Sequence, residues 1–114
     1  MVKAINEPHE LLNAIEKSKG LVVYFYNDSC APCIALRPKI KRMIDEDFNA
    51  MELLFVNSIV FPELSASFKV FSSPTIIIFF EGKENFRVSK FVSIADLSNR
   101  IDRYYKILFS NNES

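Results

Sequence analysis

The sequence predicts an α/β fold in which a mixed central sheet of four to five strands is flanked by helices on both faces. Uniformly apolar runs at 21–26 and 75–80 are typical of strands that are covered on both sides. Between such runs, apolar residues recur at three- and four-residue steps, which indicates amphipathic helices. Because 49% of the 114 residues are hydrophobic, the chain can build a substantial core, and we expect a single domain over 1–114.

The first predicted elements are a strand, a helix and a second strand. Residues 2–5 are expected to form a short edge strand, and Asn6 is placed to cap the helix that follows. Gly20 is expected to end that helix, since glycine is favoured just after a last helical turn. Residues 21–26 then predict a central strand. The apolar face of the helix is expected to comprise Leu11, Leu12 and Ile15.

The middle of the chain predicts a long helix followed by further strands. From Cys33 the apolar spacing is helical, and Pro38 should kink this helix because proline removes an interior hydrogen bond. Residues 53–56 predict another buried strand, and 62–68 suit a short helix. The β-branched and aromatic residues of 75–80 predict the next strand.

The last third predicts a hairpin and a terminal helix. A turn at 81–84 is expected to lead into an antiparallel partner strand over 85–92. Ser93 and Asp96 have the spacing of a capping box and predict the start of the last helix. Residues 110–114 are polar and are expected to fray. The apolar face of the last helix is expected to comprise Leu97, Ile101, Tyr104, Tyr105 and Leu108.

The only two cysteines lie in the segment Cys30-Ala31-Pro32-Cys33, between a predicted strand and a predicted helix. A helix N-terminus favours the thiolate, which is the nucleophilic form of cysteine. The second thiol is close enough to attack any mixed disulfide that the first one forms. The pair therefore predicts thiol–disulfide exchange, with half of an intermolecular zinc site or two inert buried thiols as the alternatives.

Charge and hydropathy exclude several functional classes. Lys plus Arg and Asp plus Glu both number 14, so the charge balance favours neither nucleic-acid binding nor a membrane surface. We see no secretory signal and no apolar run near the roughly 20 residues of a membrane span. We therefore expect a cytoplasmic protein, in which a lone cysteine pair is more often catalytic or metal-binding than structural. His9, the only histidine, is expected to be an ordinary surface residue.

Four features together resemble the thioredoxin family, over nearly the whole chain. The first is a strand followed by the 30–33 cysteine motif, and the second is Pro38 five residues after the second cysteine. The third is Ser73-Pro74-Thr75 at the start of a strand. The fourth is the hairpin at 79–83 followed by a terminal amphipathic helix. A lone cysteine motif would be a weak signal, whereas these features in this order are specific.

The resemblance implies a thioredoxin fold and dithiol–disulfide exchange on protein substrates. It implies that Cys30 is the exposed attacking thiol and that Cys33 is the buried resolving thiol. The redox-active disulfide between them then requires no metal or organic cofactor. The resemblance also implies that the bond between Ser73 and Pro74 is cis. The residues expected to shape the substrate groove are Ser29, Ala31, Pro32, Ser73 and Pro74.

Departures from the family pattern surround the motif. Ser29 stands where typical thioredoxins have tryptophan, and Ala31 where they have glycine. Tyr24 takes the place of a buried aspartate, and Phe55 that of its lysine partner. The absence of both the aspartate and the lysine is physically consistent, because either residue alone would be an unpaired buried charge that costs roughly 3–5 kcal/mol of stability. Tyr24 is expected to pack in the core with its hydroxyl hydrogen-bonded, with tuning of Cys33 as the alternative.

Further departures concern the surface near the motif. Ile34 replaces a basic residue that often follows the second cysteine. Phe61 and Phe71 are expected to belong to the core like the other aromatic residues, with a place in a partner groove as the alternative because they flank loops. A glycine that the family usually has after the last strand aligns with Lys90, Phe91 or Val92.

The leading hypothesis is a reductase of protein disulfides. It would act as a monomer and would need a separate dithiol reductase to restore its cysteines. A disulfide oxidase or isomerase with a less reducing potential is the alternative, because the ion pair and the dipeptide between the cysteines are changed. A third hypothesis is a non-catalytic module that presents a groove to one partner, prompted by Ser29, Ile34 and Ser73.

Overall fold

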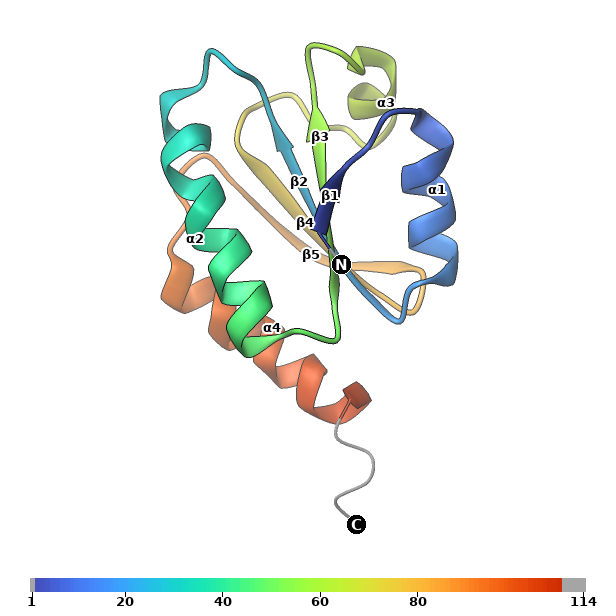
Figure 1. Ribbon diagram of the computed structural model, residues 1–114, viewed down its shortest axis with the longest axis vertical. Helices are drawn as coiled ribbons and strands as arrows, with labels where there is room; N and C mark the ends of the chain where they lie inside the picture. Colours follow the sequence, from blue (N-terminus) through green and yellow to red (C-terminus); the bar gives the residue numbers. More distant parts are fainter. Residues whose placement is uncertain (1, 110–114) are drawn as a thin grey trace.

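The computed structural model describes residues 2–109, and the expected tail at 110–114 lies outside them. Strands and helices alternate along the chain as far as a final hairpin and helix (Figure 1). The elements are β1 (Val2–Ala4), α1 (Pro8–Lys17), β2 (Gly20–Tyr26), α2 (Ala31–Asp47), β3 (Glu52–Asn57), α3 (Pro62–Ser67), β4 (Thr75–Phe80), β5 (Lys83–Ser89) and α4 (Ile94–Phe109).

A mixed sheet of five strands, in the order β1-β3-β2-β4-β5, forms the centre of the fold. The first three strands in this order are parallel, and β4 and β5 are antiparallel to their neighbours. Phe25 pairs with Thr75, and Thr75 pairs with Ser89. Therefore β4 begins at the same end of the sheet at which β2 and β5 finish. The predicted mixed α/β fold is confirmed.

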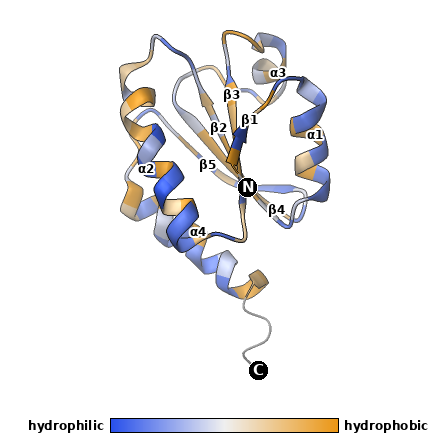
Figure 2. Ribbon diagram, viewed as in Figure 1, coloured by the Kyte–Doolittle hydropathy of each residue, from blue (hydrophilic) through white to orange (hydrophobic). Residues whose placement is uncertain are grey.

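Helices cover both faces of the sheet, with α2 and α4 on one side and α1 and α3 on the other (Figure 1). The two faces bury separate hydrophobic clusters, because successive strand residues point to opposite sides. Ile40 and Ile101 belong to the first cluster, and Leu11 and Val23 to the second. In Figure 2 the central strands are largely hydrophobic, whereas the helices carry long hydrophilic stretches.

Helix α1 differs from its predicted boundaries at both ends. Its N-cap is Glu7 rather than Asn6, whose backbone N–H instead donates to the Glu10 carboxylate at 2.9 Å. Gly20 does not end the helix but begins β2. A Cβ at Gly20 would lie 3.0 Å from Met51 Cγ, so close packing rather than a turn explains this glycine. Leu12, expected on the buried face, is 52% exposed.

The hairpin between β4 and β5 is tighter than predicted. Glu81 and Gly82 have φ values of 52° and 84° and make the whole turn, so β5 begins at Lys83 rather than at residue 85. Lys83 pairs with Phe80, and a register shift between Ile78 and Phe79 accommodates the early start. The last helix begins as expected, with the backbone N–H of Asp96 donating to Ser93 Oγ at 3.2 Å.

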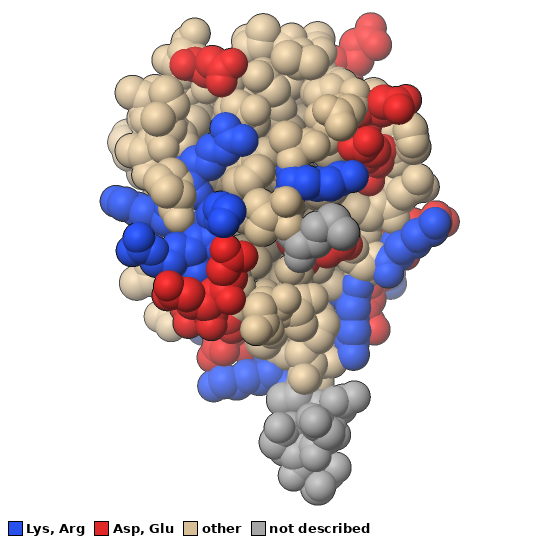
Figure 3. Space-filling view, in the orientation of Figure 1, with Lys and Arg blue, Asp and Glu red and all other residues tan. Residues whose placement is uncertain are grey.

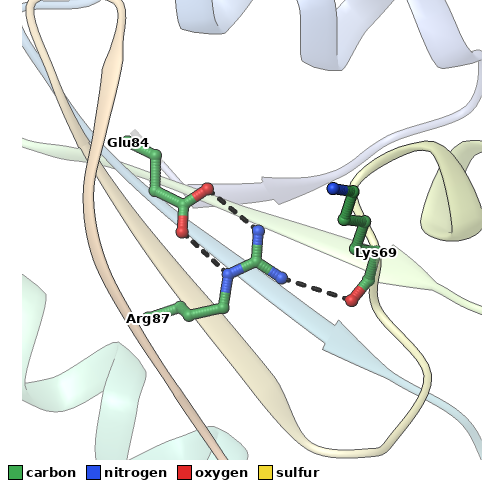
Figure 4. A network of polar contacts seen from close by, with 3 residues as sticks. All are labelled: Lys69, Glu84 and Arg87. Atoms are coloured by element: carbon green, nitrogen blue, oxygen red, sulfur yellow. Dashed lines mark hydrogen bonds and ion pairs between the residues drawn. The ribbon is translucent and has the colours of Figure 1, made fainter.

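An ion pair on β5 holds the segment that leads into β4 (Figure 4). Arg87 donates from Nε and Nη2 to the Glu84 carboxylate, at 2.7 and 2.9 Å. Its Nη1 donates to the carbonyl of Lys69 at 3.4 Å. The hydrogen bond from Arg87 lowers the pKa of Glu84, so the pair is charged at neutral pH. Lys69 lies between α3 and β4, so Arg87 ties this connection to the sheet.

Lys90, directly after β5, has a φ of 67°, in the left-handed region, which residues other than glycine adopt only at a steric cost. Replacing Lys90 by Gly is expected to raise the free energy of unfolding by about 1 kcal/mol, because the steric cost disappears. Urea denaturation would measure the change. Lys90→Ala is the matched control and should give no such gain, since it keeps the Cβ. Equal stabilisation by both variants would contradict the backbone explanation.

Candidate active site

Cys30 occupies the N-cap of α2, and the helix begins with Ala31 and Pro32. Proline fits there because its missing N–H would have no partner within the first helical turn. The backbone N–H of Cys33 donates to Cys30 Sγ at 3.2 Å, and that of Ile34 donates to the Cys30 carbonyl at 3.2 Å. An N–H aimed at the sulfur, at the positive end of a helix, stabilises negative charge on that atom.

Cys30 and Cys33 form a disulfide, with their Cα atoms 5.2 Å apart. The two sulfurs differ in access. Cys33 is 1% exposed and belongs to the core between α2 and the sheet, whereas Cys30 is only half-buried. A large reactant can therefore approach Cys30 and not Cys33. Ser29, Ala31 and Pro32 are exposed around the pair.

The loop before β4 faces this motif across the end of β2. The peptide bond between Ser73 and Pro74 is cis, and Pro74 is buried while Ser73 is half-buried. Asn27, at the end of β2, connects the two loops: its Nδ2 donates to Ser73 Oγ at 3.3 Å, and its Oδ1 accepts from the Ser29 backbone N–H at 2.9 Å. The backbone N–H of Lys90 donates to the Pro74 carbonyl at 2.9 Å.

Tyr24 is fully buried behind the motif. Its hydroxyl donates to the carbonyl of Cys33 at 2.7 Å, so both its packing and its hydrogen bond follow the prediction. Burial raises the pKa of Tyr24 to about 12, and the positive charge of Arg37 lowers it only in part. Tyr24 is therefore protonated at neutral pH. It can donate a hydrogen bond that positions the first turn of α2, but it cannot accept a proton there.

Phe55 lies beside Tyr24 on β3, with the two rings 5.5 Å apart and edge to face. The Arg37 guanidinium lies over Phe55 at 4.3 Å and over Tyr26 at 4.5 Å from the ring centroids. Aromatic faces attract such a cation, and contact with them shields it from water. The positions of Tyr24 and Phe55 thus hold an aromatic pair, and a guanidinium from α2 lies over Phe55 and the neighbouring Tyr26.

Arg37 and Asn27 were missed by the sequence reasoning. Arg37 follows Cys33 by one helical turn, so the spacing alone places both on the same face of α2. Asn27 is a polar residue directly after a buried strand, in a position typical of residues that organise loops. Both signals are present in the sequence, but they become specific only when the opposing strand and loop are known.

Exposed apolar side chains surround the motif. Phe71 is 81% exposed and so does not belong to the core as expected, whereas Phe61 is half-buried and packs against the cluster under α1 and α3. Ile34 is 61% exposed and Phe91 is 96% exposed. Figure 3 shows few charged side chains at this end of the molecule. His9 lies on the exposed start of α1, away from these residues.

Within residues 2–109, no three or more histidine, cysteine or acidic side chains come together as metal ligands would. No helix in the same region is both long and apolar enough to cross a membrane.

Comparison with known proteins identifies the family. The thioredoxin family model matches residues 2–103. The thioredoxin of Mycoplasma genitalium is 29% identical over 102 residues, which cover 87% of this chain and 99% of that protein. The thioredoxin-like protein YdfQ of Bacillus subtilis is 27% identical over 95 residues, 83% of this chain and 84% of that protein.

Solved structures agree with this assignment. Thioredoxin 1 of Thermosipho africanus is 34% identical with a TM-score of 0.71, over 81% of this chain and 99% of that one. A mutant thioredoxin of Halobacterium salinarum has a TM-score of 0.83 at 19% identity, over 91% of this chain and 90% of that one, and so shares the fold. The chain belongs to the thioredoxin family of disulfide oxidoreductases, which act on disulfides of proteins, and it carries the paired cysteines of such an enzyme.

Replacing Tyr24 by Phe removes the hydrogen bond to the Cys33 carbonyl and should lower the free energy of unfolding by about 1 kcal/mol at pH 7. The pH dependence should also change. Between pH 10 and 12 the unfolded chain ionises its tyrosine while folded Tyr24 stays protonated, so stability falls as the pH rises. This contribution, up to about 3 kcal/mol, should be absent from Tyr24→Phe.

Urea denaturation at pH values from 7 to 12 measures both effects. Tyr26→Phe, on the same strand, is the control and should keep the alkaline loss of stability. An identical pH profile for wild type and Tyr24→Phe would contradict the assigned burial of the Tyr24 hydroxyl.

Proposed function

We propose that the protein reduces disulfides of other proteins through a cycle of Cys30 and Cys33. The observation that carries this proposal is the unequal access of the two sulfurs. Cys30, half-buried at a helix N-cap, can be reached and receives a hydrogen bond on its sulfur, whereas Cys33 is 1% exposed. The two positions suit an attacking and a resolving thiol, respectively.

The reaction consists of two exchange steps. The Cys30 thiolate attacks one sulfur of a target disulfide, that S–S bond breaks, and the first target thiol leaves. Cys33 then attacks Cys30 Sγ, the mixed disulfide breaks, and the second target thiol leaves as the disulfide of the pair forms. The target gains two electrons from the pair and two protons, one from Cys33 and one from solvent, because Cys30 reacts as the thiolate.

The proton on Cys33 needs a route that Tyr24 does not provide, because that hydroxyl is protonated at neutral pH. We assign the proton to the departing thiolate of the target, which lies next to Cys33 in the mixed disulfide. The balance is then complete without a metal or organic cofactor. A separate dithiol reductase must return two electrons to the pair after each cycle.

The same proposal includes a cytoplasmic location, where protein disulfides are reduced, and action as a monomer. Ser29, Ala31, Pro32, Ser73 and Pro74 would line the place where the target chain lies. Ser73 and Pro74 suit this role because Asn27 and Lys90 hold their loop beside the motif.

A specific observation favours a second candidate, a disulfide oxidase or isomerase. Arg37 introduces a guanidinium one helical turn after Cys33, over Phe55. A cation near the cysteines stabilises the thiolate and with it the reduced form of the pair. Stabilising the reduced form makes the disulfide a stronger oxidant.

Replacing Cys33 by Ser is expected to abolish turnover and to leave target proteins attached to Cys30 as mixed disulfides. The resolving attack is the step lost, since serine is not a nucleophile under these conditions. Non-reducing electrophoresis after mixing with a disulfide-containing protein would measure the adducts. The double variant Cys30→Ser, Cys33→Ser is the control and should give none. Absence of adducts from the single variant would contradict the mechanism, and full biological function of Cys30→Ala would favour a binding module.

The reduction potential of the Cys30–Cys33 pair decides between the two candidate functions. Equilibration with dithiothreitol and glutathione buffers, read by thiol alkylation, would measure it. The proposed reductase is expected near −270 mV, as for thioredoxin, and an oxidase or isomerase in the range of roughly −180 to −120 mV. Arg37→Gln should lower the potential if the guanidinium stabilises the thiolate, and Arg42→Gln, further along α2, is the matched control.

A further inference from the structure

A groove of about 500 Å³ begins at the cysteine motif and runs between α2 and the loop after β5. It shares Pro32 and Pro74 with the candidate active site, so a chain bound at the cysteines can continue into it. The apolar residues that line it are Pro32, Ala35, Leu36, Pro74, Phe91 and Val92.

Two lysines, Lys39 and Lys90, line the same groove from its opposite sides, α2 and the loop after β5. Both side chains are exposed, and neither takes part in an ion pair with any residue from 2 to 109. None of the described residues that line the groove is acidic. Two positive charges therefore face an apolar floor without a negative partner from this part of the chain.

The surroundings do not cancel this charge within the groove. Arg42 adds a further positive charge on α2 beside a neighbouring hollow that Lys39 also lines. Glu46 and Asp47 line that second hollow, and Asp96 lines another one on the far side of the 91–93 loop. Figure 3 shows Lys and Arg side chains gathered over α2, with acidic side chains towards its far end.

Lys90 is held in place by its backbone. Its N–H donates to the Pro74 carbonyl at 2.9 Å, so the side chain starts from a fixed point next to the cis-proline. Its φ of 67° carries a steric cost that glycine would avoid. Strained backbone conformations of this kind occur preferentially at binding and active sites, where the interactions of the side chain offset the strain. Phe91, which follows it, is 96% exposed and offers a large apolar contact at the same rim.

We propose that this groove selects protein targets in which an acidic side chain and an apolar one lie near the reactive cysteine in an extended segment. The acidic group would pair with Lys90 and Lys39, and the apolar group would contact Phe91 and Leu36. This inference rests on the proposed exchange reaction, because the groove opens at Pro32 and Pro74 beside Cys30.

The test uses two peptide disulfides that are identical except for Glu or Gln on either side of the cysteine, with a leucine next in the chain and blocked termini. The reduced full-length protein is mixed with each peptide, and the second-order rate constant of exchange is measured. The variants are Lys90→Gln, Lys90→Glu and Lys39→Gln. Lys83→Gln is the matched control, since Lys83 is an exposed lysine at the opposite end of β5.

Wild type is expected to react about fivefold faster with the Glu peptide at low salt, as for steering by two exposed charges. Lys90→Gln and Lys39→Gln should each reduce this preference to about twofold, and Lys90→Glu should reverse it. Lys83→Gln should leave it unchanged. About 0.5 M salt should remove the preference from wild type, because the charges are then screened.

The rate with the Gln peptide separates charge recognition from damage to the fold, since it should be similar in all variants. Equal rates of wild type with both peptides would overturn the proposal while leaving the exchange reaction intact. The proposal would also be overturned if Lys90→Gln lowered the rate constant of exchange by the same factor for both peptides. No exchange with either peptide would instead overturn the proposed function, and this inference with it.

Discussion

The antiparallel pairing of β2 with β4 is the constraint on which the site depends. Phe25 pairs with Thr75, so the residues that follow β2 and those that precede β4 must leave the sheet side by side. Asn27 and Ser73 meet as a direct result. A slip of one residue in this register would exchange side chains between the two buried clusters and would shift the cysteine motif away from Pro74. Because both strands are buried along nearly their whole length, such a slip is costly.

The core behind the cysteines has been rebuilt without buried charge. Tyr24 and Phe55 lie at neighbouring positions of β2 and β3, where a carboxylate and an ammonium would have to be kept paired. Here the Tyr24 hydroxyl donates to the Cys33 carbonyl, and the guanidinium of half-buried Arg37 lies over the rings of Phe55 and Tyr26. The arrangement keeps every buried polar group partnered among the described side chains. With its pKa raised to about 12, the Tyr24 hydroxyl is protonated at neutral pH and donates to the Cys33 carbonyl rather than accepting a proton.

Much of the fold could be predicted because its strongest patterns are local. The limits of β4 follow from an unbroken apolar run, and the strand–motif–helix order places Cys30 at an N-cap. Predictions failed where distant contacts decide the outcome. Gly20 looked like a helix stop, yet Met51 and Phe109 pack where its side chain would be. The position of the Arg37 guanidinium over Phe55 and the groove beside Lys90 both depend on which strands and loops face α2. No local pattern in the sequence contains that information.

The burial of Cys33 has a consequence for the order in which partners can act. When the pair is oxidised, Cys30 Sγ is the sulfur of the two that a large reactant can reach. In the proposed reaction, a target disulfide and a regenerating dithiol would therefore have to use the same sulfur at different times. Competition between the two follows from this geometry, and no complex of all three proteins can form at the cysteines. The proposed reductase would then follow a ping-pong scheme, in which each partner leaves before the next one enters and an excess of either inhibits the other half-reaction.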